Sequence, residues 1–109
     1  MKIRSIAIAL FLFTISKNSI AESSGLREIE RIGCHLSDST CFVEISGNPV
    51  GPESCRSTSI RWNNDSAANG KEMLSLLMAA FAAGKQVNFN IVGSCYGTYP
   101  TFSYINIYK

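Results

Sequence analysis

The clearest pattern of apolar and polar positions predicts a strand over Gln86–Val92, QVNFNIV. Successive side chains of a strand point to opposite faces, so strict alternation indicates a strand with one buried face. Val87, Phe89 and Ile91 would lie on one face of this strand, and Asn88 and Asn90 on the other.

A second pattern, with helical spacing, predicts a helix from about Ser66 to Ala83. Any residue of the segment Asn63–Ser66 would serve as its N-cap, and Gly84 is suited to end it. One apolar stripe runs along it at positions i, i+3, i+4 and i+7, namely Leu74, Leu77, Met78 and Phe81. We expect the stripe to pack on the core. The width of the apolar surface leaves a second expectation open, in which the helix is also buried in a subunit interface.

The remaining segments predict further strands. β-Branched and aromatic residues favour strands over Thr40–Ser46, Cys55–Trp62 and Phe102–Tyr108. Leu26–Cys34 fits a strand or a short helix, and we favour the strand. Turn formers fill Gly47–Pro52 and Gly93–Thr98 between them.

The order of these elements is strand, strand, strand, helix, strand, strand. It predicts a mainly β domain with one long helix (α+β). An OB-fold, a small five-stranded barrel with its helix between the third and fourth strands, has this order. Trp62, which directly precedes the helix, is expected to pack beneath it.

The N-terminal residues predict a signal peptide over residues 1–21 that is bacterial in style. Lys2 and Arg4 precede an apolar run from Ile6 to Ile15, and Ala21 fits the cleavage position. The run is about ten residues, whereas a helix needs roughly 20 to span a bilayer. We therefore expect a secreted or periplasmic protein, without membrane insertion, whose single domain is residues 22–109.

Removal of residues 1–21 changes the charge. The full chain has a formal net charge of +2, but residues 22–109 hold seven basic and eight acidic side chains, a net charge of −1. Such a balance gives no electrostatic reason to expect a nucleic-acid partner.

Four cysteines, all within residues 22–109, predict two disulfides in an exported chain of this length. The segment CFVEISGNPVGPESC resembles a hairpin with a cysteine at each end, so we favour Cys41–Cys55, which leaves Cys34 with Cys95. The spacing alone leaves the other two pairings open. A zinc site is disfavoured, since there is no CxxC motif and His35 is the sole histidine.

Several motifs together resemble a known family. They are CFVEI, a second cysteine fourteen positions after Cys41, SIRW, and a helix that ends AAGKQVNFNI. In these features, over roughly Thr40–Ile91, the chain resembles the B subunits of subtilase cytotoxin and of typhoid-type pertussis-like AB toxins. The resemblance implies an exported OB-fold subunit that assembles into a ring, expected to be a pentamer, binds cell-surface glycans and delivers a toxin A subunit.

Five residues are candidates for ligand binding. Tyr96 and Tyr99 are expected to be exposed in a Gly/Pro turn, where aromatic faces can stack on sugars. Asp38, Arg56 and Ser57 are polar candidates chosen by residue type. The alternative function is a monomeric secreted or periplasmic module that binds a protein, such as an inhibitor.

Catalysis and cofactors are not expected. Cys34 and His35 are adjacent and would point to opposite faces of a strand, and no Gly-x-Ser-x-Gly motif or phosphate loop occurs. We therefore predict a chain that is not an enzyme and has no cofactor or catalytic residues. A small secreted hydrolase that depends on His35 is the third class considered.

Overall fold

The computed structural model describes residues 21–109, so the predicted signal peptide lies outside the described residues except for Ala21. These residues form six strands, one α-helix and one short 3-10 turn. The elements are β1 (Glu22–Arg27), β2 (Ile29–Cys34), β3 (Thr40–Ile45), η1 (Glu53–Cys55), β4 (Ser59–Asn63), α1 (Gly70–Ala83), β5 (Gln86–Tyr96) and β6 (Tyr99–Tyr108).

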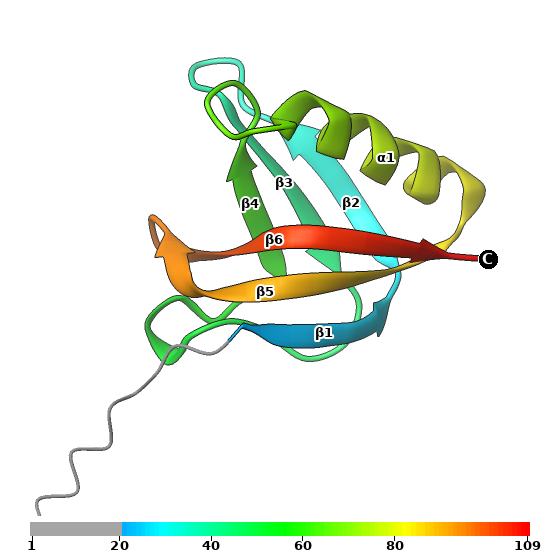
Figure 1. The fold of residues 1–109 in the computed structure, drawn as a ribbon, viewed down its shortest axis with the longest axis horizontal. Helices are drawn as coiled ribbons and strands as arrows, with labels where there is room; N and C mark the ends of the chain where they lie inside the picture. Colours follow the sequence, from blue (N-terminus) through cyan, green and yellow to red (C-terminus); the bar gives the residue numbers. More distant parts are fainter. Residues whose placement is uncertain (1–20) are drawn as a thin grey trace, which may run out of the picture.

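The strands form two antiparallel sheets of three strands each, in the orders β1-β5-β6 and β2-β3-β4. The strands of one sheet run across those of the other, and α1 lies beside β2 (Figure 1). A mainly β domain with one helix is therefore confirmed. The predicted closed barrel of five strands is not: within residues 21–109, β4 and β6 lie in contact without forming a hydrogen-bonded pair.

The predicted strand Leu26–Cys34 is in fact the end of β1 followed by β2. The chain changes sheets at Glu28, because β1 pairs with β5 whereas β2 pairs with β3. Arg27 stabilises this corner, since its Nη1 donates to the carbonyls of Ser46 (2.6 Å) and Asn48 (2.8 Å). A corner where a strand passes between sheets is a tertiary feature that no local pattern specifies.

Helix α1 begins at Gly70, four residues later than predicted. The side chain of Asn63 accepts hydrogen bonds from the backbone N–H groups of Asp65 (2.8 Å) and Ser66 (2.7 Å). It therefore stabilises a turn ahead of the helix rather than the helix itself. Gly84 ends the helix as predicted, with a left-handed φ of 65° that favours glycine.

The core lies between the two sheets and the inner face of α1. Trp62 packs beneath the helix as expected, and its Nε1 donates to the Gly70 carbonyl at 3.0 Å. The buried apolar side chains include Val43, Ile60, Leu77, Val87, Phe89 and Ile91, which are all fully buried. The alternation predicted for β5 is thus confirmed.

The predicted stripe on the helix is only half correct. Leu77 is fully buried and Leu74 packs at the edge of the core, but Met78 and Phe81 are 52% and 44% exposed. The helix instead buries Leu77 and Ala80, with Met73 partly covered. Its contact face is therefore rotated toward Met73, because α1 packs on the sheets along a narrow line rather than across its whole apolar surface.

Candidate functional site

All four cysteines form disulfides, as predicted, but the favoured pairing is wrong. The bonds are Cys34–Cys41 and Cys55–Cys95. Cys34 and Cys41 face each other across the β2-β3 pair, with 4.0 Å between their Cα atoms. Cys55 lies in η1 before β4 rather than inside a strand opposite Cys41, and this position places it beside the end of β5.

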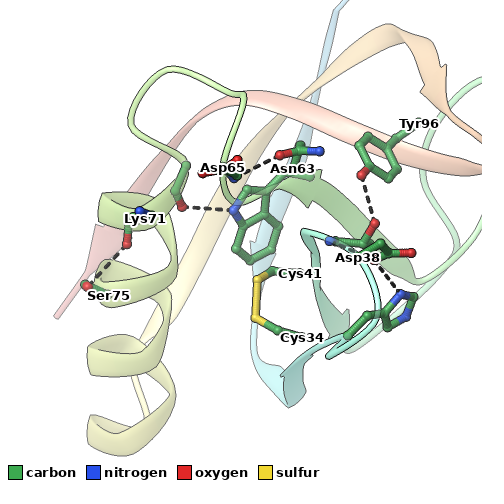
Figure 2. The surroundings of a disulfide bond; sticks show 12 residues. Cys34, Asp38, Cys41, Asn63, Asp65, Lys71, Ser75 and Tyr96 are labelled. Carbon is green, nitrogen blue, oxygen red and sulfur yellow. Dashed lines mark hydrogen bonds and ion pairs between the residues drawn. A yellow bond between two sulfur atoms is a disulfide. The ribbon is translucent and has the colours of Figure 1, made fainter.

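Two predicted binding residues, Asp38 and Tyr96, are connected through Thr40. The Asp38 carboxylate accepts a hydrogen bond from the Thr40 backbone N–H (2.9 Å) and lies 3.0 Å from Nδ1 of His35. The Thr40 hydroxyl in turn is 2.8 Å from the Tyr96 hydroxyl (Figure 2). These contacts and the Cys34–Cys41 bond hold the loop between β2 and β3 in one conformation. The binding role of Asp38 and Tyr96 stays a prediction.

The Thr40 N–H lowers the pKa of Asp38 below its ordinary value of 3.8, with a smaller contribution from His35. A lowered folded pKa means that the carboxylate stabilises the loop above the unfolded pKa, and that this contribution is lost as pH falls through the folded pKa. We expect the Thr40 amide resonance in an NMR titration to move with a midpoint below 3.8 and to lose this transition in Asp38→Asn. A titration midpoint at or above pH 3.8 would contradict the conclusion that the Thr40 N–H lowers the pKa of Asp38.

Of the other three predicted residues, Tyr99 lies opposite Tyr96 where β5 turns into β6. Tyr99 stacks on Arg61, whose Cζ lies 3.5 Å from the ring centroid. Ser57 has a structural contact, since its hydroxyl accepts the backbone N–H of Ser59 at 3.0 Å. Arg56 is exposed, and within residues 21–109 no hydrogen bond or ion pair joins its side chain or that of Ser57 to Asp38, Tyr96 or Tyr99. The structure therefore brings Asp38, Tyr96 and Tyr99 close together, whereas no hydrogen bond in residues 21–109 joins Arg56 or Ser57 to them.

A separate polar surface lies on the outer face of the β1-β5-β6 sheet, and we call it the asparagine face. It encloses a shallow hollow of about 40 Å³ lined by Ser23, Asn88, Asn90, Tyr104 and Asn106. These side chains come together because Asn88 pairs with Asn106, and Asn90 pairs with both Ser23 and Tyr104. The alternation of β5 placed Asn88 and Asn90 on the solvent face, and this was the sequence signal for the site.

Hydrogen bonds fix part of the asparagine face and leave other groups unpaired. Ser23 donates to the Asn88 carbonyl oxygen at 2.7 Å, and the Asn90 amide donates to Ser103 at 2.6 Å. Within the described residues, the Asn88 amide nitrogen and the whole Asn106 carboxamide have no hydrogen-bond partner. Tyr104 is 52% exposed beside them. Donors, acceptors and an aromatic ring are thus presented together to solvent.

Residues 21–109 contain neither a candidate metal site nor a candidate membrane-spanning helix. No group of three or more His, Cys, Asp or Glu side chains is placed to hold a metal ion. No helix of the described chain is both long and apolar enough to cross a membrane.

Comparisons with protein families, with curated proteins and with solved structures found no match to this chain.

Proposed function

We propose that this chain is an exported, non-catalytic binding subunit that recognises cell-surface glycans through the asparagine face. The observation that carries the proposal is the hollow lined by one serine, three asparagines and Tyr104. Amide and hydroxyl groups match the hydroxyls of sugars, and a tyrosine ring adds contact area at little entropic cost. A hollow of about 40 Å³ accommodates the edge of one sugar ring rather than a whole oligosaccharide.

Export is supported by the two disulfides, since such bonds persist in oxidising compartments, and by the predicted signal peptide. We place the protein outside the cytoplasm, secreted or periplasmic, on these grounds.

We further propose that the two sheets are the halves of an OB-type barrel. If β1 and β2 are counted as one strand bent at Glu28, five strands remain, and the helix lies between the third and the fourth. The contact between β4 and β6 would then be the seam of the barrel. This is the arrangement that the toxin B-subunit resemblance implies.

Assembly into a ring, as a pentamer that delivers an A subunit, is the further part of this proposal. Support comes from large apolar side chains outside the glycan hollow that are 38–52% exposed, on α1 and at the end of β6: Leu76, Met78, Phe81, Ile107 and Tyr108. Exposed apolar patches mark sites of protein interaction. The occupant proposed for it is a second copy of this chain.

The glycan proposal is tested with Asn106→Ala and Tyr104→Ala. The Asn106 side chain has no partner in the described chain, so its loss should leave the fold intact and remove about 1 kcal/mol of binding, roughly fivefold in Kd. We expect a larger loss for Tyr104→Ala. The measurements are a glycan array with the wild-type chain, followed by calorimetry with the best glycan.

Gln86→Ala is the matched control, because Gln86 lies on the same face of β5 outside the hollow. Its Kd should equal that of the wild type. An array on which the wild-type protein binds no glycan would overturn the proposal, and so would equal binding by Asn106→Ala, Tyr104→Ala and the control.

One observation favours the second candidate, a monomeric module that binds a protein. Leu36 is fully exposed at the tip of the loop that the Cys34–Cys41 bond closes. A rigid loop with an apolar tip suits an inhibitor, because little entropy is lost on binding. Native mass decides between the two: a multimer supports the toxin-like subunit, and a monomer that binds no glycan supports the protein-binding module.

A further inference from the structure

The outer face of the other sheet, β2-β3-β4, carries a stack of rings and guanidinium groups. We call this set, Arg31, Phe42, Arg61 and Tyr99, the arginine stack. The Cζ atoms of Arg31 and Arg61 lie 5.2 and 5.3 Å from the centroid of the Phe42 ring. Arg61 also lies over Tyr99 at 3.5 Å. Its guanidinium therefore contacts an aromatic ring from β3 and another from the start of β6.

The fold places these groups through strand register. Phe42 pairs with Arg61 on β4 and with Gly33 on β2. The ring lies against Gly33 so closely that a Cβ there would stand 2.9 Å from the Phe42 Cζ. Glycine at this position therefore gives the ring the room it occupies. Arg61, Phe42 and Tyr99 are all half-buried, so the stack is part of the folded surface rather than a set of free side chains.

Arg61 retains most of its hydrogen-bonding capacity. Its Nε donates a weak bond to the Ser59 hydroxyl at 3.3 Å, and its two Nη groups have no acceptor within the described chain. It forms no ion pair with residues 21–109, whereas Arg31 is paired with Glu44 at 3.1 Å. Asp38, the other carboxylate near the stack, lies beside His35, which is next to the Phe42 ring, so Arg61 is the guanidinium of the stack without a carboxylate partner in the described chain.

We infer that the arginine stack is an oxyanion-binding site, which takes a carboxylate, sulfate or phosphate group of a ligand. A guanidinium offers parallel N–H donors that match two oxygens of such a group. Stacking between Phe42 and Tyr99 holds the Arg61 plane in place, so binding costs little side-chain entropy. The site shares no residue with the asparagine face, and three of its four residues lie on the other sheet, so it goes beyond the proposed glycan site.

The test uses sodium sulfate, phosphate and acetate as probes, titrated into the oxidised protein at constant ionic strength with chloride as the balancing anion. The Nε–H resonance of Arg61 and the ring resonances of Tyr99 are followed by NMR. We expect saturable shifts with at least one probe. The anion with the lowest Kd then identifies the kind of group that the site binds. Sulfate or phosphate would indicate a tetrahedral oxyanion, and acetate a planar carboxylate. Shifts that stay linear with every probe would overturn the inference.

Arg61→Lys distinguishes binding by the guanidinium from non-specific attraction of anions to a positive charge. Lysine keeps the charge but lacks the two parallel N–H donors. We expect its Kd to rise at least tenfold. Arg56→Lys is the matched control, an exposed arginine outside the stack, and its Kd should be unchanged. Equal binding by both variants would overturn the inference.

A second variant, Tyr99→Leu, tests the same inference if the Arg61→Lys protein does not fold. Tyr99→Leu keeps Arg61 and removes one of the two rings that orient it. We expect a several-fold rise in Kd, and an unchanged Kd would overturn the role of the stack. Glycan binding at the asparagine face serves as an independent readout, since it should be unaffected by either variant.

Discussion

Replacing Cys55 and Cys95 together with alanine is expected to lower the free energy of unfolding by about 4 kcal/mol. The bond spans 40 residues and joins η1 to the end of β5, so its loss releases a large closed loop in the unfolded chain. The measurement is urea unfolding at neutral pH, followed by the fluorescence of Trp62, which is buried in the fold.

The matched control is the double alanine variant of Cys34 and Cys41. That bond spans only 7 residues, so the same chain-entropy argument gives about 2 kcal/mol. The first variant should therefore be the less stable of the two, by about 1.5 kcal/mol, or roughly a factor of 14 in the unfolding equilibrium constant. The reverse order, or a non-reduced peptide map with Cys41 linked to Cys55, would contradict the observed pairing.

Phe89→Ala is expected to lower the free energy of unfolding by about 3–5 kcal/mol. Phe89 is fully buried in the middle of β5, and its ring meets the ring of Phe102 edge to face, with 5.6 Å between the centroids. Truncation removes this contact and leaves a cavity between the sheets. The free energy is obtained from the same urea titration.

Phe81→Ala is the control for this change, because it removes the same atoms from a side chain that is 44% exposed on α1. The protein should be compared at a concentration where it is a single species, and the control should lose well under half as much stability as Phe89→Ala. Similar losses for the two variants would show that the core does not lie where the structure places it.

Several elements could be predicted because their signals are local. The alternation in Gln86–Val92 predicts β5, and Gly84 after an apolar helical pattern predicts the end of α1. Trp62 is a large apolar residue that precedes the helix in the sequence. This position predicted that its side chain would pack beneath α1. In each case the residues that carry the signal are also the residues that form the element.

The contacts around the candidate residues could not be predicted from the sequence, for a physical reason. Tyr96 was chosen as an exposed ring and Asp38 by its residue type, whereas in the fold both contact Thr40, and the Thr40–Tyr96 contact links residues 56 positions apart. The asparagine face likewise needs Ser23 of β1 opposite Asn90 of β5. Residue type alone does not reveal such neighbours, because they depend on which strands pair and in which register.

The sequence by itself therefore determined the mainly β class, the single helix and its end, and the presence of two disulfides. Periodicity, a left-handed glycine and an even cysteine count are properties of short segments or of composition. The tertiary structure alone decided which cysteines meet, where β1 gives way to β2 at Glu28, which side of α1 is buried, and how Arg61 comes to lie between Phe42 and Tyr99. These features depend on strand register and on packing between distant segments, and no local pattern specifies either of them.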